Sequence, residues 1–137
     1  MTKEQLVKEA ILARKQTYSP YSKFGVGAAL LMKDGKVIHG ANIENASFGL
    51  SNCAERSALF QAYSLGYRKD DILMMAITGD TLNPISPCGA CRQVMNELLE
   101  KNTPIFLSNL TGKIKETSMK ELLPYAFDEI EHHENEF

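Results

Sequence analysis

The sequence lacks the features that mark nucleic-acid-binding and membrane proteins. Its 137 residues contain 15 Lys and Arg against 17 Asp and Glu, for a net charge of -2, so the basic stripe usual in polyanion-binding proteins is missing. No segment approaches the roughly 20 apolar residues that a membrane-spanning helix needs, and the first residues lack the apolar core of a signal peptide. We therefore predict a soluble, cytoplasmic protein with neither a nucleic-acid nor a membrane partner.

Cysteine is also scarce, and its few copies are clustered. The three cysteines are Cys53, which has Glu55 two residues after it, and the pair Cys88 and Cys91, which follows Pro87. No thiol is left over for a disulfide or for filling the core. Three reduced thiols placed in this way fit a reducing compartment.

The length and composition indicate one globular domain over residues 1–137, with an acidic tail at about 128–137 that we expect to be frayed. No linker, repeat or low-complexity segment interrupts the chain. Apolar periodicity and turn signals predict an α/β fold of three layers, α-β-α, around a mixed five-stranded sheet. The expected helices cover residues 2–17, 54–65, 86–99 and 118–123, and the expected strands cover 26–32, 37–43, 72–78, 104–107 and 114–117.

Three cysteine ligands are one fewer than a structural zinc site takes, and a catalytic zinc keeps its fourth position open. Cys88 and Cys91 are spaced i, i+3 on a predicted helix, with Ser86 as the N-cap and Pro87 as the first helical residue, so both thiols share one face. Cys53 begins the preceding helix. Because helix N-termini favour thiolate over thiol, we predict one Zn²⁺ per chain at these three residues.

Glu55 lies next to this cluster without being needed as a ligand, which suits a general acid and base. The alternatives are a structural zinc site and a redox Cys-x-x-Cys pair. A structural site would need His39, His132 or His133 as its fourth ligand, and none has zinc-finger spacing. A carboxylate beside the metal favours the catalytic interpretation.

Three thiolates leave a zinc site with net negative charge, which weakens the metal as a Lewis acid. Arg56 and Arg92 directly follow Glu55 and Cys91, and either could donate hydrogen bonds to the sulfurs. A solvated helix arginine is the alternative for both. We favour Arg56 for the role around the metal and leave Arg92 open.

Beyond this zinc-deaminase signature, the chain resembles the small, homotetrameric cytidine deaminases that use three cysteines. The resemblance implies zinc-dependent hydrolytic deamination of cytidine and deoxycytidine to uridine and deoxyuridine, with release of ammonia, in pyrimidine salvage. Glu55 would then be the proton shuttle. The matching segments are residues 18–24 (YSPYSKF), 26–30 (VGAAL), 40–46 (GANIENA), 53–58 (CAERSA), 86–94 (SPCGACRQV) and 121–124 (ELLP), followed by Phe127.

The same resemblance implies roles for further residues. Asn42 and Glu44 would bind the ribose hydroxyls, with Ile43 between them contributing at most its backbone. Residues two apart on a strand face the same side, so both side chains can reach one sugar. The other implied contacts are stacking of Phe24 on the pyrimidine, a hydrogen bond from the Ala54 backbone N–H to the base carbonyl, and closure of a neighbouring subunit's site by Phe127.

Without the resemblance, Phe24 and Phe127 would be taken as core aromatics, and Asn42 and Glu44 as a solvated strand face. Two positions depart from the family pattern. Gly25 replaces a common proline, which predicts a less rigid loop. Phe48 replaces a frequent tyrosine and lacks its hydroxyl.

Other activities compete with this prediction. A deaminase of an analogue such as blasticidin S would share the cysteine pattern, and guanine or polynucleotide deaminases are further alternatives. An editing enzyme needs a basic groove, and Glu44 would repel a phosphate, so a free nucleoside is favoured. A non-catalytic zinc-stabilised interaction module would have no use for Glu55.

Overall fold

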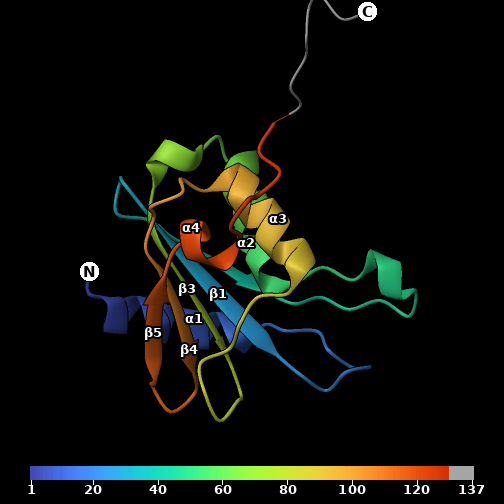
Figure 1. The fold of residues 1–137 in the computed structure, drawn as a ribbon. Coiled ribbons are helices and arrows are strands. Elements are labelled where there is room, and N and C mark those ends of the chain that lie inside the picture. Colours follow the sequence, from blue (N-terminus) through green and yellow to red (C-terminus); the bar gives the residue numbers. More distant parts are fainter. Residues whose placement is uncertain (130–137) are drawn as a thin grey trace, which may run out of the picture.

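The computed structural model describes residues 1–129, which form a mixed five-stranded sheet with helices on both faces (Figure 1). This confirms the predicted fold class. The strand order is β2-β1-β3-β4-β5, and only β3 and β4 are parallel. The strands are β1 (Val26–Met32), β2 (Val37–Ala41), β3 (Ile72–Gly79), β4 (Ile105–Asn109) and β5 (Ile114–Thr117).

One face of the sheet is covered by α1 (Lys3–Arg14), which lies behind the strands in Figure 1. Thr2 begins this helix with a capping box, in which its hydroxyl accepts from the backbone N–H of Gln5. The helix ends at Arg14, three residues before the predicted end. Thr17 instead donates its hydroxyl to the backbone carbonyl of Asn42, beyond the end of β2, at 2.9 Å, so the chain is drawn to the sheet edge.

The other face is covered by α2 (Ala54–Ser64), α3 (Gly89–Leu98) and the short α4 (Met119–Leu122). Because both faces are packed, β3 is almost continuously apolar, as its sequence predicts. Gly40 in β2 lets α2 approach closely, since a Cβ there would lie 2.3 Å from the carbonyl oxygen of Ala54. The core on this side is built from fully buried side chains that include Leu30, Leu59, Ile77, Met95 and Ile105.

Two predicted boundaries near the cysteines were wrong. The N-cap of α3 is Cys88 rather than Ser86, and its side chain accepts from the backbone N–H of Cys91. The strand β2 ends at Ala41, so Asn42 and Glu44 lie in the segment that follows it. Two short 3-10 helices, η1 (Phe48–Leu50) and η2 (Lys69–Asp71), flank α2.

Within residues 1–129, no helix combines the length and the apolar character that crossing a membrane requires. Asp128, the first residue of the predicted frayed tail, is anchored, because its carboxylate accepts from Asn96 at 2.7 Å and from Lys101 at 2.9 Å. The rest of that predicted tail from residue 130, including His132 and His133, lies outside the described residues.

Candidate active site

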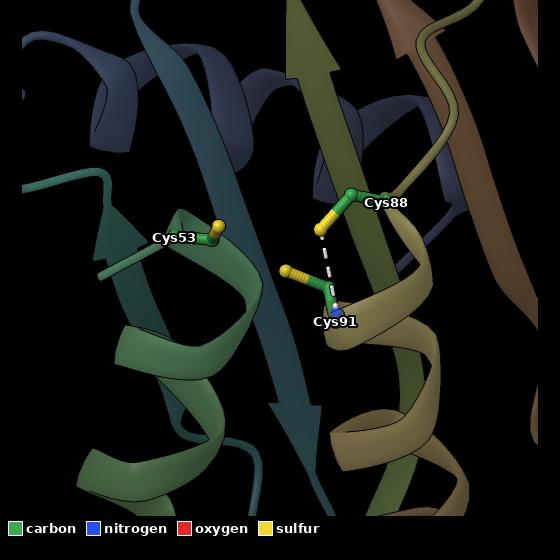
Figure 2. A group of neighbouring side chains, drawn as sticks. All are labelled: Cys53, Cys88 and Cys91. Atoms are coloured by element: carbon green, nitrogen blue, oxygen red, sulfur yellow. Dashed lines mark hydrogen bonds between the residues drawn. The ribbon is translucent and has the colours of Figure 1, made fainter. Parts of the chain in front are cut away.

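The three cysteines converge from the N-termini of two helices (Figure 2). Cys53 is the N-cap of α2, Cys88 is the N-cap of α3, and Cys91 lies in the first turn of α3. Their sulfur atoms all lie within 4.8 Å of one another. The sequence predicted this convergence, although the exact start of α3 differs.

Three clustered thiols form a donor set that suits Zn²⁺, which binds thiolate strongly. In residues 1–129, this group includes no fourth cysteine, histidine or carboxylate. His39 is on β2, where its ring contacts Glu9 of α1 at 3.2 Å. The described residues therefore fit a zinc site with three protein ligands and one position left for another molecule.

Hydrogen bonds within the cluster shift the pKa values of two of its thiols in opposite directions. Cys53 accepts a hydrogen bond from Cys91, and this bond, together with a hydrogen bond from Arg56 and its charge, lowers the pKa of Cys53 to about 5. The same hydrogen bond and burial raise the pKa of Cys91. Arg56 donates from Nη2 to the sulfur of Cys53 at 3.2 Å. This is the contact that the sequence predicted for Arg56, while its effect on the metal stays a prediction.

Arg92 points elsewhere, although it also follows a ligand directly. Its guanidinium donates to the carbonyl of Pro87 at 2.9 Å, to the carbonyl of Leu122 at 2.8 Å and to the hydroxyl of Ser86 at 2.7 Å. Arg92 therefore fastens the segment before α3 to α4. It is neither a solvated arginine nor a partner of the sulfurs.

A cavity of about 260 Å³ lies beside the cysteines. It collects many of the predicted site residues: Phe24, Asn42, Glu44, Cys53, Ala54, Glu55 and Cys88. It is also lined by five residues that sequence reasoning missed, Ser22, Val26, Ile77, Ile85 and Ser86.

Membership of the matching motifs could have indicated three of the missed residues, Ser22, Val26 and Ser86. Ile77 and Ile85 carry no signal beyond their apolar character. Four predicted residues are not in the cavity wall: Cys91, Arg56, Ile43 and Phe127. Ile43 is 46% exposed and pairs with Tyr18 and Asn52, and Phe127 is 65% exposed, with its carbonyl accepting from Gln93 at 2.9 Å.

Glu55 is only 4% exposed, yet it lines the cavity together with Cys53 and Cys88. Burial raises the pKa of its carboxyl group above the usual range. A carboxyl group whose pKa is shifted towards neutrality can both accept and return a proton near neutral pH. The arrangement therefore permits proton transfer beside the metal ligands.

Asn42 and Glu44 face the same cavity, but both are also tied to the protein. The Asn42 side-chain oxygen accepts from the Val26 N–H at 2.8 Å and the Thr17 hydroxyl at 2.5 Å, and its amide nitrogen donates to the Phe24 carbonyl at 2.9 Å. These contacts fix the orientation of the amide and leave one N–H of its NH₂ group uncommitted within the described chain.

One oxygen of Glu44 accepts from the backbone N–H groups of Tyr21 and Ser22, at 3.1 and 3.0 Å. Its other oxygen accepts from the Ser22 hydroxyl, and this bond contributes most to lowering the pKa of Glu44. Glu44 thus remains an ionised acceptor at the cavity wall, and it also holds the loop that leads to Phe24.

The two departures from the family pattern have different settings. At Gly25, Arg14 donates from Nε to the carbonyl at 2.9 Å, and the methyl group of Thr17 fills the space where a Cβ would lie. These contacts tie Gly25 to α1 and to Thr17, and the lower rigidity of the loop stays a prediction. Phe48 lies on η1, which projects away from the sheet in Figure 1, and is 79% exposed.

Comparison with known proteins identifies relatives over nearly the whole chain. A family described as the cytidine and deoxycytidylate deaminase zinc-binding region matches residues 1–107. The chain is 61% identical over 127 residues to a cytidine deaminase of Halalkalibacterium halodurans, covering 93% of this chain and 95% of that one. It is 52% identical to a cytidine deaminase of Sporosarcina psychrophila, with coverage of 93% and 92%.

Solved structures show the same relationship. The crystal structure of a cytidine deaminase from Burkholderia pseudomallei matches with a TM-score of 0.90 at 53% identity, covering 93% of this chain and all of that one. A cytidine deaminase from Mycobacterium tuberculosis matches with a TM-score of 0.75 at 34% identity, with coverage of 93% and 98%.

Proposed function

The chain belongs to the cytidine and deoxycytidylate deaminase family, and from this premise we propose that it catalyses the zinc-dependent hydrolytic deamination of cytidine and deoxycytidine. The products are uridine or deoxyuridine and ammonia. The observation that carries the proposal is the position of Glu55, a buried carboxyl group in a cavity wall beside two of three converging cysteines.

Cys53, Cys88 and Cys91 would hold Zn²⁺, and the bound metal would supply a Lewis acid that makes water a better nucleophile. Glu55 accepts a proton from the water that attacks the amino-bearing carbon of the base. It passes this proton to the ring nitrogen. It then takes the second proton of the attacking water, from the hydroxyl group now bonded to that carbon, and passes it to the amino group. The carbon–nitrogen bond breaks, the carbonyl forms and ammonia leaves. The raised pKa of Glu55 supports both steps, because the group must be a base first and an acid afterwards.

Asn42 and Glu44 form a complementary pair for a sugar hydroxyl. The uncommitted N–H of Asn42 can donate a hydrogen bond to the hydroxyl oxygen. The carboxylate of Glu44, which has free lone pairs, can accept a hydrogen bond from the same hydroxyl. A single hydroxyl satisfies both, so a ribose and a deoxyribose that share it both bind. The negative charge of Glu44 disfavours a phosphate at this end of the cavity, which supports a free nucleoside as the substrate.

Three further contacts complete the proposed site. Phe24 flanks the base, and the backbone N–H of Ala54, which as the first N–H of α2 has no intrahelical partner, donates to the base carbonyl. Ile43 acts as a spacer between Asn42 and Glu44, because its N–H and C=O are both bonded to Asn52 at 2.9 Å.

Phe127 lies outside the cavity and is exposed, so we propose that it completes the site of a neighbouring subunit in a homotetramer. Light scattering at micromolar concentration should give four times the chain mass. An active monomer would contradict this arrangement. The free nucleoside substrate supports a role in pyrimidine salvage, and reduced ligand thiols support a cytoplasmic location.

Replacement of Glu55 tests the central assignment. Glu55→Gln keeps the shape of the side chain but removes the base, so turnover should fall by roughly 10²- to 10⁴-fold, while zinc stays near one per chain. Glu97→Gln, on the exposed surface of α3, is the matched control and should behave as the unmodified protein does.

An ultraviolet assay on cytidine, deoxycytidine, cytosine and blasticidin S defines the substrate. Turnover of the two nucleosides alone supports the proposal. Turnover of blasticidin S alone would favour the analogue-deaminase alternative, and no turnover by zinc-loaded protein would favour a non-catalytic module. A Glu55→Gln variant within a few-fold of normal activity would remove Glu55 from the mechanism.

A further inference from the structure

Gly79, the last residue of β3, lies directly behind two side chains of the cavity wall. A Cβ at this position would be 2.7 Å from Cδ1 of Ile85 and 3.3 Å from Cζ of Phe24. Both residues line the cavity. The φ angle of Gly79 is not positive, so the backbone conformation does not require glycine there. What matters is the space that the missing side chain leaves.

Ile85 can respond to a larger residue at position 79 only by moving its side chain. Its backbone N–H donates to the carbonyl of Ser108 in β4 at 3.0 Å, which fixes the main chain. Its side chain packs against the core that α2 and α3 build with the sheet, and it also borders the cavity. Because the protein interior is close-packed, the cavity is the free volume into which Cδ1 can move.

Phe24 is constrained in a similar way. Its N–H donates to the hydroxyl of Ser22 at 3.0 Å, and its carbonyl accepts from Asn42 at 2.9 Å. The backbone is held, so a closer neighbour at position 79 would turn or shift the ring. Since the ring flanks the cavity, this shift changes the surface offered to the base.

We propose that Gly79 and Ile85 are a volume-matched pair that sets the width of the base-binding end of the cavity and positions the ring of Phe24. Gly79 is thus a specificity-determining residue that makes no polar contact with the substrate. This inference rests on the proposed nucleoside deamination. Adding a methyl group at position 79 narrows the cavity, and removing Cδ1 from residue 85 restores its width.

The test compares Gly79→Ala, Ile85→Val and the double variant with the unmodified protein. Gly49→Ala is the control for the added methyl, because a Cβ at Gly49 would meet no atom within 4 Å. The measurements are kcat and KM for cytidine, the dissociation constant of uridine, zinc content and thermal unfolding. Uridine binding reports on the cavity independently of turnover.

Gly79→Ala should raise KM and weaken uridine binding by about 3- to 30-fold, with kcat changed less than about threefold and zinc content unchanged. The double variant should recover most of the binding, because valine lacks the atom that lies 2.7 Å from the new methyl. Gly49→Ala should leave all five measured quantities unchanged. Such compensation between contacting residues is a non-additive effect that separate sites do not show.

Normal binding by Gly79→Ala would overturn the inference, as would binding by the double variant no better than by Gly79→Ala. Loss of folding or zinc in Gly79→Ala would also overturn it, because the flexible end of Ile85 is expected to yield. These outcomes test the inference only when the unmodified protein is active. If the zinc-loaded unmodified protein fails to deaminate cytidine, the proposed function itself has failed.

Discussion

Removal of Arg56 should weaken zinc binding and slow turnover, while leaving substrate affinity nearly unchanged. Its guanidinium donates to the sulfur of Cys53 at 3.2 Å, and Cys53 is the main cause of the raised pKa of Arg56. Arg56 does not line the cavity. Loss of Arg56 should therefore change zinc binding at Cys53 and leave the affinity for the nucleoside nearly unchanged.

The size of the effect follows from that one contact. A hydrogen bond to a charged group contributes about 1.5–3 kcal/mol, and a tenfold change in affinity corresponds to about 1.4 kcal/mol. Arg56→Ala should thus lower zinc affinity by about 10- to 100-fold, the range usual for groups that support metal ligands. Because Arg56 is only partly buried, the lower half of this range is expected.

The pH dependence has a definite sign. Arg56 contributes to lowering the pKa of Cys53 to about 5, so without it this pKa rises. Since zinc binds thiolate, protons then compete with the metal at higher pH. Zinc loss on acidification should begin at higher pH in Arg56→Ala, and the acidic limb of the rate profile should move in the alkaline direction.

The assay measures zinc retention against a chelator across the pH range, together with kcat and KM. Arg56→Lys restores the charge without the forked donors and should recover only part of the effect. Arg68→Ala, near the far end of α2, is the control and should retain zinc normally. If Arg56→Ala kept its zinc, turnover and pH profile, the contact with Cys53 would have no functional role.

Three other changes probe the scaffold and the ligands. Gly40→Ala would place a Cβ 2.3 Å from the carbonyl oxygen of Ala54 and 2.6 Å from the backbone nitrogen of Ala58. Because both are backbone atoms, α2 must shift. Urea unfolding should show that the free energy of unfolding falls by about 1–3 kcal/mol, and zinc binding should weaken. Arg92→Ala removes three hydrogen bonds, two to the segment before α3 and one to Leu122 of α4, so the free energy of unfolding should fall by about 1–3 kcal/mol. Zinc loss should show no alkaline shift; such a shift would mean that Arg92 also supports the metal. Cys91→Ala removes a buried ligand, and metal analysis should show zinc falling from about one per chain to well below it, whereas full occupancy with normal activity would exclude Cys91 as a ligand.

Local patterns in the sequence were sufficient to predict which segments form helices or strands and which cysteines cluster. The apolar run of β3 depends on neighbouring residues alone, so it could be identified without a fold. The pairing of Cys88 with Cys91 likewise depends on the geometry of one helical turn. Cys53 joined them because no other cysteine exists in the chain.

The boundaries near the site were harder to predict because tertiary contacts set them. The end of α1 depends on the hydrogen bond between Thr17 and Asn42, which are far apart in sequence. Ser86-Pro87 resembles a helix start, yet Cys88 is the N-cap. The hydroxyl of Ser86 instead accepts a hydrogen bond from the Arg92 guanidinium.

The sequence by itself determined the α/β fold, the three cysteines placed to hold a metal ion and the carboxylate beside them, because each depends on residue type and short spacing. The sequence favoured Arg56 over Arg92 for the role around the metal. Only the tertiary structure settled where Arg92 points, since the position of α4 decides it. It alone brought Ile85, which lines the cavity, against Gly79. Packing between segments that are distant in sequence leaves no local pattern, and the shape of this cavity is made by such packing.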